Sequence, residues 1–151
     1  MEQFNAGDQR VPVDFAGLQL PAGFVSHCGG FHLHETRPVL GVLLESEHLN
    51  SLRIAHGGLI ATFADTAMGV VYRRERPDSL APVTLSLSLD YLSPAREGEW
   101  LEAHVEILKS RGTFVSVQCL VKVGERLVTR ASAVLALLSK APTSSISDTL
   151  D

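Results

Sequence analysis

The run 58–74 is the feature of this 151-residue chain that most restricts its fold, because it is apolar on nearly every side. At 1.5 Å per residue such a run predicts an α-helix of roughly 25 Å. A helix with apolar residues on most of its faces is buried on most of them. The positive charges of Arg73 and Arg74 are stabilising near the negative C-terminal end of a helix dipole, and Pro77 cannot continue the helix. Both features predict that the helix ends near residue 74. The rest of the chain therefore has to surround one helix.

After this helix the sequence alternates apolar and polar residues with a period of two, which is typical of strands with one buried face. One predicted face of the first strand carries Leu85, Leu87, Leu89 and Tyr91, and the opposite face carries Thr84, Ser86, Ser88 and Asp90. Further strands are predicted at 101–107, 115–123 and 127–138, and before the helix at 30–35 and 39–46. Strands of about nine to twelve residues span roughly 30–40 Å, which suits the helix if the sheet curls around it. We therefore predict an α+β fold, a long antiparallel sheet wrapped around one central helix.

The chain is short enough to form one folded domain, because two domains of this total length would each have a thin core. We assign 1–24 to an N-terminal arm, with at most one helical turn or short helix around 13–18. The folded domain is assigned to 25–139. The segment 140–151 has too few apolar groups to offset the entropy of ordering, so it is predicted to be a flexible C-terminal tail.

The composition excludes several classes of partner. The formal net charge is −4 and no dense Lys/Arg run occurs, which argues against a nucleic-acid partner. No apolar run approaches the roughly 18 residues that a membrane span needs, and the first residues lack the order of a signal peptide. Cys28 and Cys119 have no CxxC spacing and are predicted to be reduced, packed thiols. These features predict a cytoplasmic protein with no membrane partner.

The second face of the predicted sheet would be poorly covered in a monomer. It is polar from Thr84 to Asp90, but other strands present apolar residues on it: Phe114, Leu120, Val134 and Leu138. A partner subunit would cover such a surface. We therefore predict a homodimer or a homotetramer built as a dimer of dimers.

The sequence His56-Gly57-Gly58 opens the predicted helix. The first amides of a helix lack intrahelical acceptors and lie at the positive end of its dipole, and glycine lets a ligand oxygen come close. Such a position suits a thioester carbonyl oxygen, which becomes negative when the carbonyl is attacked. A tight turn into the helix is the alternative, which a glycine pair alone does not exclude.

Asp65 lies in the middle of the apolar helix, where an unpaired carboxylate costs several kcal/mol. A buried structural hydrogen bond could offset that cost, but an acid in such surroundings is more typical of a general base or nucleophile. Seven residues, or roughly 10 Å, separate Gly58 from Asp65 along the helix. Both cannot act on one carbonyl within one subunit, so a shared site has to combine two subunits.

Together these residues resemble the hotdog-fold thioesterases of the phenylacetate-pathway (PaaI) type. The resemblance covers roughly 39–138 and rests on the motif HGGxxxxxxD that begins at His56, with Asn50 six residues before it. The segment 91–95, Tyr-Leu-Ser-Pro-Ala, is also similar to that family. The resemblance implies a hotdog fold and hydrolysis of an acyl-CoA thioester, with no metal and no cofactor.

The resemblance also implies roles for individual residues. Asp65 would act as the base or nucleophile, and the Gly57 amide of the facing subunit would polarise the thioester oxygen. Asn50 would position the water or the carbonyl, and His56 would organise the loop. Thr84 would hold the water or Asp65, with an ordinary strand residue as an equal alternative.

Substrate contacts are predicted at four further positions. Gly58 completes the glycine loop, which is the segment His56-Gly57-Gly58 at the start of the helix. Phe63 and Met68 would shape the pocket for the acyl group. Arg111 lies in a predicted hairpin and would bind the phosphates of coenzyme A, unless that hairpin is an ordinary solvated turn.

His32 and His34 alternate on one predicted strand, and such a pair can bind a metal. Because no third ligand is near in the sequence, we expect these histidines to be exposed or hydrogen-bonded and predict no metal site.

Two other functions are compatible with this fold. A non-catalytic acyl-CoA sensor or carrier would not need Asp65, so the combination of Asp65 with Asn50 and Thr84 favours an enzyme. A dehydratase of hydroxyacyl thioesters needs its catalytic histidine in a different motif from that of His56. The sequence leaves open the acyl group and the choice between coenzyme A and acyl-carrier-protein thioesters.

Overall fold

The computed structural model describes residues 4–5 and 8–138. Its helical segments are the short 3₁₀ helices η1 (Val25–Cys28) and η2 (Ser46–His48) and the α-helix α1 (Gly57–Glu75). Its strands before α1 are β1 (Phe4–Asn5), β2 (Asp8–Pro12), β3 (Phe15–Gly17), β4 (Phe31–His34) and β5 (Val39–Leu43). Those after α1 are β6 (Ala81–Tyr91), β7 (Trp100–Arg111), β8 (Phe114–Val123) and β9 (Arg126–Leu138).

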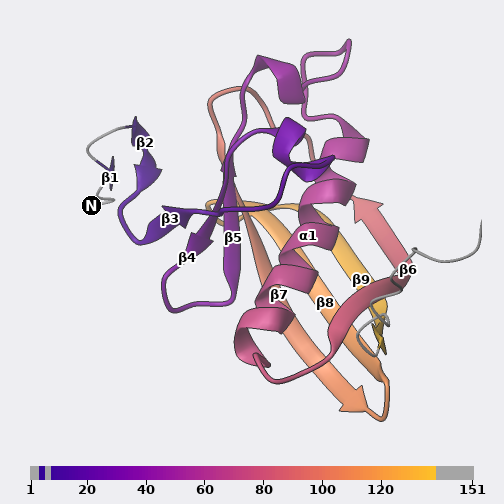
Figure 1. Ribbon diagram of the computed structural model, residues 1–151. Helices are drawn as coiled ribbons and strands as arrows, with labels where there is room; N and C mark the ends of the chain where they lie inside the picture. Colours follow the sequence, from indigo (N-terminus) through magenta and orange to yellow (C-terminus); the bar gives the residue numbers. More distant parts are fainter. Residues whose placement is uncertain (1–3, 6–7, 139–151) are drawn as a thin grey trace, which may run out of the picture.

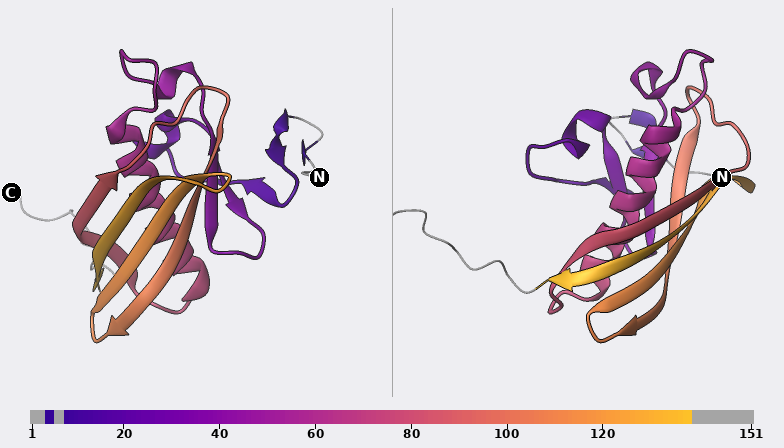
Figure 2. Two further views of the ribbon diagram at one scale, coloured as in Figure 1. Left: turned by 180° about the vertical axis from the view of Figure 1, so that it is seen from behind. Right: turned by 90° about the vertical axis from the view of Figure 1, so that its right-hand side faces the viewer.

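One antiparallel sheet curls around the single long helix (Figures 1 and 2). Its seven strands have the order β3-β4-β5-β7-β8-β9-β6, and β1 and β2 form a separate two-stranded sheet. The predicted strands correspond to β4 through β9, with ends that differ by a few residues. The predicted α+β architecture, a hotdog fold with a central helix, is confirmed.

The helix α1 buries one stripe of its surface in this chain. The buried residues, spaced three and four apart as a helical face requires, are Ile60, Phe63, Ala64, Ala67, Met68, Val71 and Tyr72. Leu59, Ala61 and Val70 are only half-buried. The expectation of a helix buried on most faces is therefore wrong for a single chain, since the apolar residues outside the stripe remain partly open.

The face assignment of the first strand after the helix is wrong at its beginning, because β6 contains a bulge. The register with β9 shifts between Thr84 and Ser86, and Leu85 between them is 58% exposed. Thr84, in contrast to Leu85, lies opposite Leu135 of β9, whose side chain is buried in the core. A bulge inserts one residue into one strand and reverses the alternation of side chains beyond it. Thr84 therefore lies on the inner face of the sheet, toward α1.

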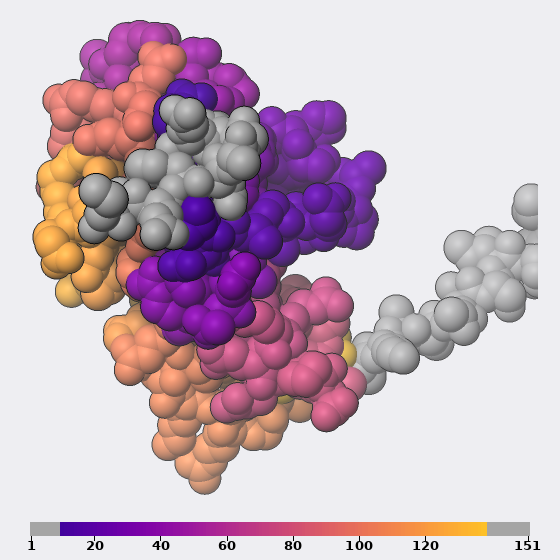
Figure 3. Space-filling model, turned by 90° about the vertical axis from the view of Figure 1, so that its left-hand side faces the viewer, coloured from indigo at the N-terminus to yellow at the C-terminus, as the bar shows by residue number. Residues whose placement is uncertain are grey.

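The N-terminal segment packs on the sheet, and the helical turn expected around 13–18 is wrong. β3 forms there instead and pairs with β4, with Phe15 opposite His34. Val11 and Phe15 are buried with Val39 in a small second core. The space-filling view shows the indigo N-terminal residues lying against the violet segments that follow them (Figure 3). Backbone pairing with β4 and burial of Phe15 stabilise a strand over a helical turn. The predicted tail 140–151 lies outside the described residues.

The outer face of the sheet carries exposed apolar side chains, as the sequence predicts. Phe114 and Leu138 are 55% and 51% exposed, and Leu120 and Val134 are half-buried. A partner subunit over this face stays a prediction. Across the described residues, no helix is long and apolar enough to cross a membrane.

Gly41→Ala is expected to lower the free energy of unfolding by about 1–3 kcal/mol, because overpacking forces neighbouring side chains out of their rotamers. A Cβ atom at Gly41 would lie 2.1 Å from Cζ2 of Trp100, whose indole donates a hydrogen bond to Glu102. Gly17→Ala in β3 is the matched control, since nothing lies within 4 Å of its Cβ position. Urea unfolding measures both variants, and equal small losses would contradict this account of the sheet.

Candidate active site

A tight loop precedes α1 and is built on the side chain of Asn50. Its Oδ1 atom accepts hydrogen bonds from the amides of Leu52 at 2.9 Å and Ile54 at 3.4 Å. The Asn50 amide donates to the Ile54 carbonyl at 2.9 Å, and Arg53 takes the left-handed conformation that closes the loop (φ 61°). An asparagine oxygen commonly stabilises such a turn by bonding amides a few residues further on. Asn50 therefore shapes the loop through its side-chain oxygen, while its side-chain Nδ2 group makes no hydrogen bond within the described residues.

His56 is the N-cap of α1. Its backbone is extended (φ −64°, ψ 133°), and its Nδ1 atom accepts a hydrogen bond from the Gly58 amide at 2.8 Å. Because Nδ1 is an acceptor, the proton of the neutral ring lies on Nε2. A Cβ atom at residue 58 would lie 3.0 Å from this Nδ1 atom. Glycine at 58 therefore keeps the cap in place.

Gly57 presents a backbone donor at the positive end of the helix. Within the described residues, its amide donates no hydrogen bond. Its carbonyl, in contrast, accepts a hydrogen bond from the Tyr91 hydroxyl at 2.7 Å. A free first-turn amide at a helix N-terminus can donate to an anionic oxygen. The Gly57 amide can therefore supply one donor of an oxyanion site.

A pocket of about 410 Å³ opens beside this amide. It is lined by Asn50, Ile54, Ala55, Gly57, Ile60 and the segment 91–95. The apolar side chains of this lining suit an organic group better than a bare ion.

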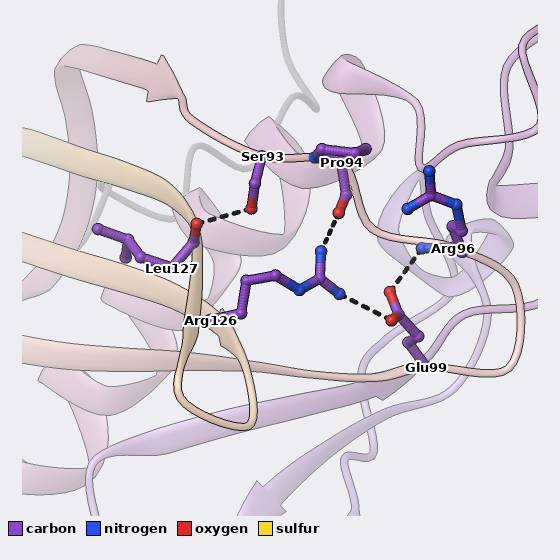
Figure 4. A network of polar contacts seen from close by, with 6 residues as sticks. All are labelled: Ser93, Pro94, Arg96, Glu99, Arg126 and Leu127. Atoms are coloured by element: carbon purple, nitrogen blue, oxygen red, sulfur yellow. Dashed lines mark hydrogen bonds and ion pairs between the residues drawn. The ribbon is translucent and has the colours of Figure 1, made fainter.

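The wall of the pocket at 91–95 is held by a polar network (Figure 4). The guanidinium of Arg126 donates to the Pro94 carbonyl and to the Glu99 carboxylate, the latter at 2.7 Å. The Ser93 hydroxyl donates to the Leu127 carbonyl at 2.7 Å. These contacts anchor the segment after β6 to the first residues of β9, which holds the wall of the pocket in place.

Asp65 and Thr84 form a second group, further along the same helix. The Thr84 hydroxyl donates to Oδ1 of Asp65 at 2.7 Å, and the carboxylate is half-buried. In the described part of the chain, no donor contacts Oδ2. Eight residues separate Gly57 from Asp65, which corresponds to about 12 Å along the helix. The chain thus carries two half-sites, one at the start of α1 and one in its middle.

Three predicted substrate residues are not brought to the pocket. Phe63 and Met68 are fully buried in the main core, where Phe63 packs edge-on against Phe31. Arg111 ends β7 and pairs with Phe114, at the opposite end of the sheet from Tyr91. Within one chain, none of these side chains can touch a group bound beside Gly57.

Two residues of the site were missed by the sequence reasoning. Tyr91 is predicted as a strand residue and as part of the family-like segment 91–95, but with no role in the site, because no local signal indicates that its hydroxyl bonds the Gly57 carbonyl. His48 is buried, and its ring accepts from the Glu45 amide at 2.9 Å and contacts the Cys28 carbonyl at 2.6 Å. Its own carbonyl accepts from the His56 amide at 2.8 Å, so His48 anchors the loop to η1.

Other reactive side chains have structural explanations. Burial raises the pKa of the Cys119 thiol to about 12, which removes it as a nucleophile. Nδ1 of His34 accepts from the amides of Thr36 and Arg37, and burial together with the Arg37 charge lowers the His34 pKa. Within the described ranges, no group of three or more histidine, cysteine or acidic side chains could hold a metal ion.

Comparison with known proteins assigns the family. A family model for the thioesterase superfamily matches residues 52–130, which include the glycine loop, Asp65 and Thr84. The chain belongs to the thioesterase superfamily. A relative from Pseudomonas aeruginosa, the "Putative esterase PA0474", is 39% identical over 103 residues, 66% of this chain and 74% of that protein. Hydrolysis is therefore the general reaction class of this thioesterase-superfamily protein.

Solved structures agree with this membership. The BH2602 protein from Bacillus halodurans, whose crystal structure contains CoA, is 27% identical with a TM-score of 0.63, over 68% of each chain. The Escherichia coli PaaI protein from the phenylacetic acid degradation operon has a TM-score of 0.62 at 19% identity, over 72% of this chain and 73% of that one. The second likeness shows the shared fold alone. The roles of individual residues in this superfamily member stay predictions.

Proposed function

We propose that this protein hydrolyses acyl-CoA thioesters at a site shared by two protomers, with Asp65 from one and the Gly57 amide from the other. One observation carries the proposal: an unbonded helix-start amide and a threonine-bonded carboxylate lie on the same helix, about 12 Å apart. A thioester carbonyl needs both groups within about 3–3.5 Å of its reacting atoms. The helix spacing forbids that in one chain.

The edge strand β6 supplies a surface for the second protomer. β6 ends the sheet, and its Val83 and Leu85 side chains are 44% and 58% exposed. An unpaired, long strand edge is a template for pairing with another chain. Two β6 edges related by a two-fold axis would make the two α1 helices antiparallel.

A two-fold axis that passes beside Ala61 would bring the Gly57 half-site of one protomer opposite the Asp65 half-site of the other. Residues 57 and 65 are each four positions from residue 61, so Gly57 of one antiparallel helix faces Asp65 of the other. The small, half-buried Ala61 allows helix axes to approach to about 8–10 Å. Symmetry then produces two identical sites, each with one amide and one carboxylate.

The chemistry follows from these groups. Thr84 engages Oδ1 of Asp65 and leaves Oδ2 to accept a proton from water while the water oxygen attacks the thioester carbon. The carbonyl oxygen becomes negative and accepts from the partner Gly57 amide. The C–S bond then breaks, and the leaving thiolate takes up the proton. Direct attack by Oδ2, followed by hydrolysis of the acyl anhydride, uses the same residues.

The ligand class rests on the pocket and on the relatives. The apolar lining beside Gly57 suits an acyl group, and Asn50 in the same lining adds a polar group where the thioester would lie. The Bacillus halodurans relative was crystallised with CoA, which supports a coenzyme A thioester as the substrate. Arg111 remains a predicted phosphate contact that has to come from the partner.

Asp65→Asn is expected to reduce kcat at least about a hundredfold on a panel of short, medium, long and aromatic acyl-CoAs, because it removes the proton acceptor. Asp90→Asn is the matched control: this carboxylate lies on β6, away from α1, and pairs with Arg130 at the surface. Thiol release measures turnover. Wild-type protein that releases no thiol, or an Asp65→Asn variant as active as wild type, would refute the proposal, and acyl-CoA binding without turnover would indicate a sensor.

Gly57→Pro is expected to lower kcat about 10²–10³-fold, because proline removes the proposed oxyanion donor. Proline is well tolerated at the first position of a helix, and the extended backbone of His56 is compatible with a following proline. Gly57→Ala is the control, since it keeps the amide and places its Cβ atom at an ordinary 3.4 Å from the Tyr91 ring. Equal activity of the proline and alanine variants would show that the amide takes no part.

A further inference from the structure

Tyr91 is connected to His56 through a single peptide group. The Tyr91 hydroxyl donates to the Gly57 carbonyl at 2.7 Å, and the amide on the other side of that peptide, Gly58, donates to Nδ1 of His56 at 2.8 Å. The Tyr91 ring also lies 3.4 Å from the Cβ position of Gly57. The carbonyl of this peptide group is therefore held by Tyr91 from the end of β6, and its N–H is held by His56.

This arrangement has an electronic consequence. A peptide carbonyl that accepts a hydrogen bond makes the N–H of the same peptide a stronger donor. The stronger Gly58 donor favours the His56 tautomer that accepts at Nδ1 and carries its proton on Nε2. Since His56 is exposed, its Nε2–H can donate to a bound group.

We infer that Tyr91 is a positioning residue that holds His56 in its Nε2–H form, so that the loop can offer the His56 ring N–H, in addition to the Gly57 amide, to a bound thioester. The inference rests on the proposed function for its effect on turnover, whereas the tautomer itself is a property of the free protein. Tyr91 touches no reacting atom in this scheme and acts through the loop alone.

The test combines nuclear magnetic resonance with kinetics on Tyr91→Phe, which keeps the ring against Gly57 and removes only the hydroxyl. Long-range ¹H–¹⁵N spectra of ¹⁵N-histidine-labelled protein, recorded at about pH 8.5, above the ordinary histidine pKa, report the tautomer. The His56 signal is identified by its loss in His56→Gln. Wild type is expected to show Nε2–H, and Tyr91→Phe a mixture of both tautomers. Steady-state hydrolysis should show kcat lowered about 3- to 10-fold, the effect of one lost hydrogen bond, with KM changed less than about twofold.

Tyr72→Phe is the matched control. Its hydroxyl bonds the Ser79 hydroxyl at 2.8 Å, near the other end of α1. This variant is expected to lower the melting temperature without changing the His56 tautomer or kcat, which separates a structural loss from the positioning role.

Three results would overturn the inference: Nδ1–H in wild type, an unchanged tautomer in Tyr91→Phe, or an unchanged kcat in that variant. If Tyr91→Phe does not fold, Tyr91→Leu, which also lacks the hydroxyl, takes its place in both measurements. If Tyr91→Phe shifts the tautomer but the wild-type protein hydrolyses no thioester, the proposed function is refuted, whereas the control of the His56 tautomer by Tyr91 is supported.

Discussion

The rise of the α-helix, about 1.5 Å per residue, is the constraint on which the account of this protein depends. It fixes the Gly57 amide and the Asp65 carboxylate about 12 Å apart on one rigid element. Neither group can move toward the other without unwinding α1, whose buried stripe holds it to the sheet. A shared reaction therefore requires a second chain. The half-buried face of the helix and the edge of β6, the last strand of the sheet in the described residues, supply a surface where that chain would bind.

The local contacts in the two half-sites follow the same pattern. Thr84 engages one oxygen of Asp65 and leaves the other available, while His56 and Tyr91 hold the peptide after Gly57 and leave the Gly57 amide available. In each half-site, neighbouring polar groups fix the geometry without occupying the atom that would react. Preorganised donors of this kind avoid reorganisation during the reaction, which is why they are effective in catalysis.

Much of this could be predicted from the sequence, because the signals are periodic or local. The apolar run before Arg73 predicts the helix, and the period-two stretches predict the sheet around it. The placement of Thr84 could not be read in this way, since the bulge at Leu85 arises from pairing with β9 and reverses the alternation. The strand at Phe15–Gly17 likewise depends on its distant partner β4. The burial of Phe63 and Met68 in the core could not be predicted either, because a core residue and a residue that lines a ligand pocket have the same apolar signature in the sequence.

The shared site is tested most directly by a mixed dimer of two inactive protomers, one with Asp65→Asn and one with Gly57→Pro, purified through a different affinity tag on each. If every site combines Asp65 of one chain with Gly57 of the other, one of the two sites in the mixed dimer has both intact groups. The mixed dimer is expected to regain about half of the wild-type activity, while each variant alone stays inactive. A mixed dimer as inactive as its parents would place both groups in one chain and contradict the account.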